Sequence, residues 1–395
     1  MSTQTTPLHD KFVDLRTALM GRHLERNDEI EVALVAVLSR YHVALIGPPG
    51  TAKSMLTSDI CNAFEGAYYF EHLMNKFTTP EELYGPVDIS MLEEGKYQRV
   101  IDGMLPQARI AFLDEVFKAN SAILNANLQL MNERKYKHGP ETIHVPLDTL
   151  FGASNELPEG EELGALFDRF QFRKTVDYIH EPGNFVKMLR TNLTADLPSI
   201  TLEELEQAQE DVKSIEIPDS VIDTLYDIRA DLQMEGVIPS DRRFYQTQSA
   251  LRAMAWLEGR NQVTDDDFRI LQHMLWTQPQ EIKKVSRVIL THTNPLDLQA
   301  DEIIDMADEI AGQLTSALLD CKQKGLNPKE ALLKEGVEWF TKCKSLSDDV
   351  KSLERKAETQ GKNTNRIQQA RERVLRVARE ISRQTIGFDS MEDGK

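Results

Sequence analysis

Short apolar runs separated by helical patterns are the feature that most constrains how the first 180 residues fold. The runs are "HVALIG" (42–47), "AYYFEHL" (67–73), "RIAFLDE" (109–115), "DTLFGASNE" (148–156) and "FRKTVDY" (172–178). Short buried strands that alternate with helices are typical of a mostly parallel sheet with helices on both faces. The sequence therefore predicts an α/β core over residues 1–180, with two helices over 8–41 before the first strand.

Two segments interrupt this alternation. Residues 80–106 hold β-rich runs around the turn "EEGK" (93–96), and residues 134–146 have the pattern of a hairpin through "HGPE" (138–141). We expect both segments to be β-hairpins inserted into the α/β core.

Strand signals stop near residue 181, and helical patterns continue to about residue 385. We expect an all-helical lid over 181–280, with Thr264 and Asp267 at capping-box positions of one helix. A helical domain should follow over 281–385, with a disordered tail over 386–395. Its apolar residues repeat at alternating spacings of 3 and 4, which predicts three helices packed along a/d seams. The seam residues are Ile303, Ala307, Ile310, Leu314 and Ala317; Leu346, Val350, Leu353 and Ala357; and Ile367, Ala370, Val374, Val377 and Ile381.

The charge balance argues against non-specific binding to polyanions. The chain has 46 Lys and Arg against 64 Asp and Glu, for a formal net charge of −18. Such a chain is a poor partner for nucleic acid or anionic membrane, whose affinity comes from neutralised phosphates. Its 3 cysteines fit no disulfide framework, which favours a reducing cytoplasm. We expect neither a signal peptide nor a membrane span.

The segment "GPPGTAKS" follows the first apolar run and matches a phosphate-binding P-loop at every defining position except one. Gly47 and Gly50 would supply tight turns, and Lys53 would reach the β- and γ-phosphates of ATP. The exception is Ala52, which stands where the pattern has glycine. A residue entering a helix normally has a negative φ, so a methyl group should be tolerated there. We expect the whole loop to contact the nucleotide, that is Gly47, Pro48, Pro49, Gly50, Thr51, Ala52, Lys53, Ser54 and Met55.

Acidic and amide side chains end the third and the fourth of the apolar runs. Asp114 and Glu115 close "RIAFLDE", a Walker B pattern, in which Asp114 and Ser54 would hold Mg²⁺ and Glu115 would activate water. Asn155 ends the following run, where its amide would position the attacking water. The alternative for Asn155 is an ordinary strand-to-turn asparagine.

Arginines further along the chain are candidates for stabilising the transition state. Arg169, in "LFDRF", would act on the nucleotide of a neighbouring subunit, with Arg173 as second choice. The alternative is a surface arginine paired with Asp168. In "IPSDRRFYQ", Arg242 or Arg243 would reach the γ-phosphate from the lid.

Together these motifs resemble the AAA+ ATPases, and "GPPGTAKS", "FLDEVFKANSAILNANLQLMNERKY", "ASNELPE" and "LFDRF" are similar to the MoxR family, with the RavA branch as the nearest likeness. The resemblance implies that alanine before the P-loop lysine is usual. It also implies that Asn155 is sensor 1, Arg169 the finger acting in trans and Arg242 sensor 2. "MGRHLERNDEI" (20–30) resembles the segment lining the adenine pocket, which brings in Arg22 and His23.

The resemblance further implies a homo-hexameric ring that hydrolyses ATP with Mg²⁺ and remodels partner proteins, often together with a von Willebrand factor A domain protein. The helices over 295–384 look like the triple-helical region that follows the RavA AAA+ module. Two alternatives stay open. A nucleic-acid motor would use the basic hairpin "RKYKH" (134–138), and a non-hydrolysing scaffold would use nucleotide only for assembly.

Overall fold

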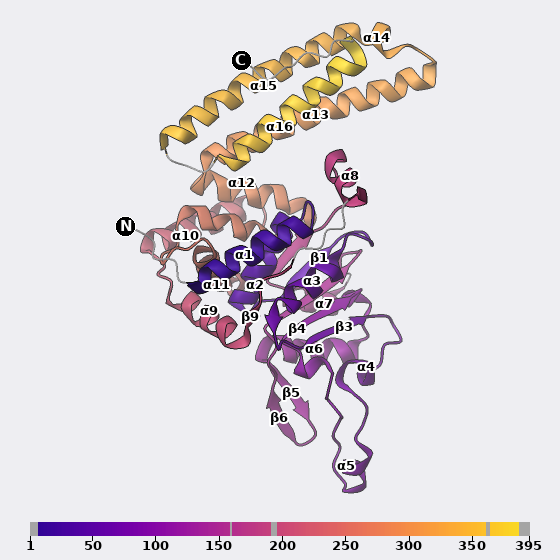
Figure 1. Ribbon diagram of the computed structural model, residues 1–395, viewed down its shortest axis with the longest axis vertical. Coiled ribbons are helices and arrows are strands. Elements are labelled where there is room, and N and C mark those ends of the chain that lie inside the picture. Colours follow the sequence, from indigo (N-terminus) through magenta and orange to yellow (C-terminus); the bar gives the residue numbers. More distant parts are fainter. Residues whose placement is uncertain (1–6, 159, 191–195, 361–363, 387–395) are drawn as a thin grey trace. The chain divides into compact units, whose positions relative to one another are not determined.

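The computed structural model describes residues 7–386 except 159, 191–195 and 361–363. The described residues divide into two compact units, with the boundary between Ser286 and Arg287 (Figure 1). The first unit contains an α/β core and a helical region, and the second consists of helices.

A five-stranded parallel sheet lies at the centre of the α/β core in the described part of the chain. Its strands run in the order β3 (Tyr69–Leu73), β4 (Ile110–Asp114), β7 (Thr149–Ser154), β1 (Val43–Ile46) and β8 (Phe172–Thr175). Each predicted apolar run contains one of them, so the predicted α/β fold is confirmed. Because β7 lies between β4 and β1, the residues that follow these three strands meet at one edge of the sheet.

Helices pack around this sheet as expected. The two predicted N-terminal helices are α1 (Pro7–Arg22) and α2 (Asn27–Ser39), and α2 contacts β1 and β8. Helix α3 (Lys53–Asn62) follows the P-loop and contacts β4, while α6 (Ser121–Glu133) and α7 (Glu161–Phe167) come after β4 and β7. Helix α2 also contacts α1, α9 and α11, which places it between the sheet and the helical region.

The prediction of a β-hairpin over 80–106 is wrong in its secondary structure. The segment forms α4 (Pro80–Tyr84), α5 (Ile89–Glu93) and the 3₁₀ turn η1 (Leu105–Gln107). Of a hairpin it keeps one antiparallel bridge, Val87 with Arg99. The reason that this segment turns helical is an N-cap. Asp88 Oδ1 accepts hydrogen bonds from the backbone N–H groups of Ser90 and Met91 and starts a helical turn.

The second insert is the predicted antiparallel hairpin, made of β5 (Lys135–His138) and β6 (Glu141–His144). It lies beside the first insert (Figure 1). The rings of Tyr84 and Tyr136 stack with their centroids 5.4 Å apart. The Nε2 atom of His138 is 2.8 Å from the carbonyl oxygen of Arg99.

Among the described residues from 182 to 281, the regular structure is helical except for one short strand. It contains α8 (Pro182–Arg190), α9 (Leu202–Ser214), α10 (Asp219–Met234), α11 (Asp241–Leu257), η3 (Asp265–His273) and η4 (Pro279–Glu281). The exception is β9 (Ile200–Thr201), which pairs in parallel with β2 (Phe64–Glu65) and is too short to show a period in the sequence. The predicted capping box is present, with Thr264 N–H donating to Asp267 Oδ2 at 2.8 Å, although the helix it opens is 3₁₀.

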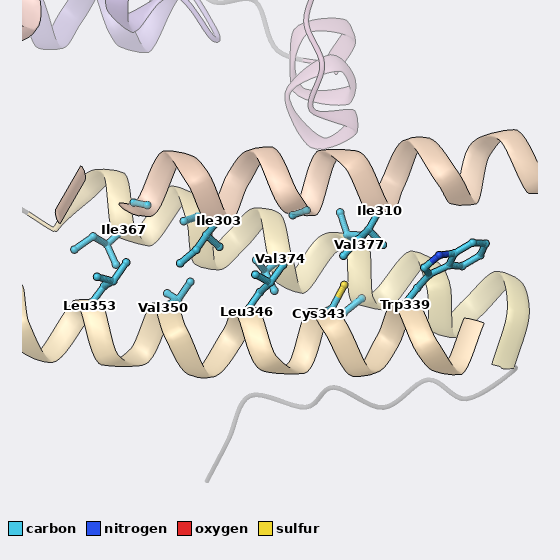
Figure 2. Packing of buried hydrophobic residues seen from close by; sticks show 14 of the residues in the cluster. Ile303, Ile310, Trp339, Cys343, Leu346, Val350, Leu353, Ile367, Val374 and Val377 are labelled. Carbon is cyan, nitrogen blue, oxygen red and sulfur yellow. The ribbon is translucent and has the colours of Figure 1, made fainter. Parts of the chain in front are cut away.

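The C-terminal helices confirm the predicted seams. Helix α12 (Ile282–Thr293) leads into α13 (Pro295–Lys324), followed by α14 (Pro328–Ala331), α15 (Leu333–Gln360), α16 (Asn365–Ile381) and a π-helical turn (Ser382–Ile386). The seam side chains of α13, α15 and α16 point into one shared core, to which Trp339 and Cys343 also belong (Figure 2). Every predicted seam residue is buried except Ala317, which is partly buried. The predicted tail lies outside the described residues beyond Ile386.

Candidate functional site

The P-loop connects β1 to α3, and its two glycines are needed for different reasons. A Cβ on Gly47 would lie 1.9 Å from the carbonyl oxygen of Val176, so only glycine fits beside β8. Gly50 has a φ of 78°, which other residues adopt only at a cost. Both glycines are therefore required by the loop. Gly50 is required by its left-handed backbone, and Gly47 by its close approach to Val176.

The predicted conformation of Ala52 is wrong. This residue is the N-cap of α3 and has φ 63° and ψ 26°, in the left-handed region. An L-residue pays about 1–2 kcal/mol for that conformation. Ala52 is exposed, so its methyl group meets no steric obstacle, and the cost comes from its own backbone. The pattern's glycine would avoid that cost.

Lys53 lies on the inner side of the loop, where its ammonium group meets backbone oxygens. Its Nζ donates to the carbonyl oxygens of Gly47 and Pro48, each at 2.9 Å, and the hydroxyl of Thr51 donates to Pro48 at 3.1 Å. Burial lowers the pKa of Lys53, and the nearby carboxylates of Asp114 and Glu115 oppose that shift. The lysine thus feels both acidic residues of the neighbouring strand.

Asp114 and Glu115 stand at the end of β4, next to Asn155 at the end of β7. Asn155 Nδ2 donates to Glu115 Oε1 at 2.7 Å, and Lys118 Nζ lies 3.2 Å from the other carboxylate oxygen. Glu115 has φ 52°, and its N–H donates to Asp114 Oδ1 at 3.0 Å. The structure therefore brings together the predicted metal ligand Asp114, the predicted base Glu115 and the amide of Asn155. Lys118 was missed, although its position three residues after Glu115 was a signal.

Arg22 and His23 meet at a carboxylate of α3. Arg22 Nε lies 2.8 Å and His23 Nε2 lies 2.7 Å from Asp59 Oδ2. Burial lowers the pKa of His23, and Asp59 opposes that shift. Arg26, which the sequence analysis missed, donates from Nε to the carbonyl oxygen of Thr51 at 3.4 Å. This segment therefore braces the P-loop and α3, while the adenine contact stays a prediction.

Asp168 directly follows α7 and is the common partner of the candidate arginines. Within the described residues its carboxylate lies within ion-pair distance of Arg169, Arg173, Arg242 and Arg243. The sequence analysis treated Asp168 only as a possible partner of Arg169. Its contacts with the other three arginines could not be read from spacing.

Arg173 and Arg243, the second choices, are buried and fixed by backbone oxygens. Arg173 donates to the carbonyl oxygens of Trp276 and Phe167, and its guanidinium lies 4.0 Å above the Phe167 ring. Arg243 donates at 2.9 Å to the carbonyl oxygens of both Gln171 and Met274. Burial lowers the pKa of Arg173 to about 8, the neighbouring Arg243 adds to this, and Asp168 opposes it. These two arginines connect the α/β core with the helical region.

Arg169 and Arg242 are more exposed, with 24% and 41% of their side chains accessible. Both contact Oδ2 of Asp168. The Nε atom of Arg169 is buried and has no hydrogen-bond partner among the described residues. Of the candidate arginines, these two are therefore the ones with the freedom to turn toward an anion.

The remaining predicted contacts line the loop's outer rim. Ser54 is half-buried at the start of α3, Met55 is 47% exposed, and Pro49 is exposed. Among the described residues no group of three or more His, Cys, Asp or Glu side chains is arranged to hold a metal ion. In the same residues no helix is both long and apolar enough to cross a membrane.

Comparison with protein-family models gives two matches along the first unit. Residues 10–216 match the MoxR domain of the MoxR–vWA–β-propeller ternary systems. Residues 220–289 match an AAA lid domain. The first match covers the P-loop, Walker B strand, Asn155 and Arg169, and the second covers Arg242.

This chain is also similar in sequence to individual proteins and in fold to a solved structure. An uncharacterised protein of Methanocaldococcus jannaschii is 41% identical over 80% of this chain and 82% of its own length. The protein MoxR of Paracoccus denitrificans is 26% identical over 71% of this chain and 92% of its own. The crystal structure of a candidate ATPase from Cytophaga hutchinsonii superposes with a TM-score of 0.60 at 16% identity, covering 73% of this chain and 95% of that one. At that identity the last likeness shows a shared fold.

Proposed function

The chain belongs to the MoxR family of AAA+ ATPases, and from this premise we propose that it hydrolyses ATP between the subunits of a hexameric ring in order to remodel or activate partner proteins. The observation that carries the catalytic part is the meeting of Glu115 and Asn155 at 2.7 Å beside the P-loop strand. A carboxylate and an amide at that edge have the chemistry to take a proton from water and to orient it.

Each residue of the edge has a separate role in this proposal. The backbone of the P-loop and Lys53 bind the phosphates, with Lys53 exchanging the carbonyl oxygens of Gly47 and Pro48 for phosphate oxygens. Glu115 accepts the proton of the attacking water, and Asn155 holds that water in line. Each oxygen of Glu115 has one partner, Asn155 or Lys118, and each can accept a further hydrogen bond from the attacking water.

The residues present fit a magnesium ion bound together with nucleotide. Ser54 and Asp114 offer a hydroxyl and a carboxylate, and Mg²⁺ in such sites takes one or two protein oxygens with the rest from phosphate and water. Bound there, the ion would neutralise charge that develops on the phosphates.

The ring is proposed from the family, and within it Arg169 is the candidate for acting between subunits; it is partly exposed and pairs with Asp168. An arginine in that position is suited to act on a neighbour's nucleotide, where such a residue contributes about 10³–10⁵-fold to turnover. Arg169→Ala and Lys53→Ala subunits should each be inactive alone. Mixed, they should regain turnover, because some interfaces then pair an intact pocket with an intact arginine. If mixed rings form and stay inactive, Arg169 has no role in trans.

The partner is proposed from the description of the matching family model, which names systems containing a vWA protein. A purified von Willebrand factor A domain protein from the same cells should co-elute with the ATP-loaded Glu115→Gln ring and separate from it in ADP. Co-elution that ignores the nucleotide would contradict remodelling. The cytoplasmic location and the particular likeness to RavA stay predictions.

Turnover of the wild type and Glu115→Gln tests the enzyme itself. Phosphate release should fall at least about 100-fold in the variant, while a fluorescent ATP analogue still binds. Glu133→Gln is the matched control, since Glu133 pairs with Lys135 at 3.6 Å on the second insert. Equally slow turnover in the wild type and Glu115→Gln would show that hydrolysis does not proceed as proposed.

The alternative of a nucleic-acid motor rests on the basic hairpin segment of residues 134–138 in the second insert. It requires DNA to stimulate turnover at about 150 mM salt, where non-specific phosphate contacts are already weakened.

A further inference from the structure

The two carboxylate oxygens of Asp168 face different pairs of arginines. Oδ1 lies 3.1 Å from Arg243 Nη2 and 3.8 Å from Arg173 Nη2. These are the two buried arginines that backbone oxygens hold in place. That side of Asp168 therefore anchors the carboxylate in a fixed position between the α/β core and the helical region.

Oδ2 faces the two arginines that are free to move. It accepts from Arg242 Nη2 and from Arg169 Nη1, the latter at 3.4 Å. A single oxygen serves one residue from the helical region and one from the core. Both arginines contact it at once, but their like charges repel each other, and the contact of Arg169 is long at 3.4 Å.

The cluster also has more positive than negative charge. Four guanidinium groups lie around the Asp168 carboxylate, and with Glu281, which also acts on Arg173, the positive charge is still in excess among the described residues. Opposite charges in a partly desolvated cluster attract strongly, so an additional anion is favoured near the exposed pair. A nucleotide γ-phosphate is such an anion, and the predicted sensor role of Arg242 would bring its exposed side chain toward that phosphate while the buried pair stays in place.

We propose that Asp168 is a positioning residue that couples a subunit's own nucleotide to the arginine it offers its neighbour. When ATP in the same subunit draws Arg242 away, Oδ2 is left to Arg169 alone and holds it in the orientation needed at the next site. When that subunit is empty, Arg242 keeps the oxygen and Arg169 is poorly held. This inference rests on the proposed trans role of Arg169 and on the predicted sensor role of Arg242.

Mixed rings test the coupling, with Arg169→Ala subunits as acceptors because they keep an intact pocket and lack the arginine. Two donors supply the arginine: Glu115→Gln, which binds ATP without hydrolysing it, and Lys53→Ala, which does not bind it. The ATP-loaded donor should support at least about 5-fold more acceptor turnover than the empty donor, a modest part of the effect of such an arginine.

Further substitutions in the donors identify Asp168 as the cause. Adding Arg242→Gln to the Lys53→Ala donor should raise its support to the level of the Glu115→Gln donor, because Oδ2 then serves Arg169 alone. Adding Asp168→Asn to either donor should reduce the acceptor turnover that it supports, to the same low level for both. Asp241→Asn is the matched control: Asp241 neighbours Arg242 but pairs with Arg229, and its loss should change neither donor.

The outcomes separate this inference from the function on which it rests. If neither donor supports turnover although mixed rings form by cross-linking, the trans role of Arg169 fails. If donors support turnover but Asp168→Asn or Arg242→Gln leaves their ratio unchanged, the coupling through Asp168 fails. Melting of the Asp168→Asn donor reports whether it folds, and if it does not, the Arg242→Gln comparison decides the question.

Discussion

Asn155 donates its side-chain amide to Glu115 across the ends of two adjacent strands, β7 and β4, at 2.7 Å. The contact joins residues 40 positions apart in the sequence. It fixes the carboxylate that the proposed reaction needs as a base, and it makes Asn155 sensitive to any shift of Glu115.

Asn155→Ala should lower the turnover number about 10- to 100-fold, because a misplaced water and base cost about that much. Affinity for ATP should change less than about 3-fold, since the side-chain amide of Asn155 donates to Glu115. Steady-state kinetics with a separate binding titration measures both. Asn62→Ala is the control, because its exposed amide meets only Ser58. A loss of affinity equal to the loss of turnover would assign Asn155 to binding.

Ala52→Gly should leave nucleotide affinity largely intact, whereas Lys53→Ala should abolish it. Glycine removes the cost of the left-handed backbone at φ 63°, but it also frees the unfolded chain. The free energy of unfolding should therefore rise by up to about 1 kcal/mol. Urea unfolding and a nucleotide titration measure the two effects.

Ala230→Gly provides the contrast for Ala52→Gly. Ala230 is half-buried inside α10, so glycine there should lower the free energy of unfolding by about 1 kcal/mol. Equal losses from both changes would show that Ala52 does not have the left-handed conformation. A large loss of nucleotide affinity in Ala52→Gly would give its methyl group a direct role.

His42 should make the protein sensitive to acid. Its Nδ1 accepts from the N–H of Leu150 at 3.0 Å, and burial, with Arg134 adding to it, lowers its pKa from 6.5 to about 3. The unfolded chain takes up the proton below about pH 6.5 while the folded chain does not. The free energy of unfolding should therefore fall as the pH drops from 6.5 toward 3, by up to about 5 kcal/mol from this group.

Denaturant unfolding of the wild type and His42→Gln at several pH values checks this. The glutamine variant should be less stable at pH 7 but should lose less stability on acidification, because its amide takes up no proton. Parallel curves for the two proteins would mean that the pKa of His42 is the same in the folded and the unfolded chain.

Leu353→Ala should destabilise the C-terminal helices by about 2–5 kcal/mol, because Leu353 is 4% exposed in their shared core. Leu319→Ala, at a site 57% exposed on α13, should change stability by less than about 0.5 kcal/mol. Hydrogen exchange of the α15 amides reports on this unit alone. Similar exchange in both variants would contradict the observed packing.

The parts of the fold that could be predicted from the sequence are those with a strong local pattern. Buried strands such as Ile110–Asp114 are apolar throughout, and the seams of α13, α15 and α16 repeat over many turns. Helix α5 was missed because it depends on one cap, Asp88, within a segment of strand-like composition. The pairing of β2 with β9 was missed because two residues carry no period.

In the candidate site too, the residues that could be predicted are those that belong to a local sequence pattern. Lys53, Asp114, Glu115 and Asn155 stand at motif positions and meet where predicted. The left-handed backbone of Ala52 was not predictable, because a motif gives residue types and not dihedral angles. Neither was the burial of Arg243 beside the exposed Arg242, since neighbours in sequence differ only through the tertiary packing around them.

The joint between the α/β core and the helical region has two parts that respond differently to salt. Arg173 and Arg243 are buried and donate to peptide carbonyls across the joint, which dissolved ions hardly reach. The pair between Arg242 and Asp168 is partly exposed and is screened as ionic strength rises. Added salt should thus weaken the grip on Arg242 while the two regions stay fastened. The ionic strength of the surroundings can therefore adjust how readily this arginine moves without loosening the fold that carries it.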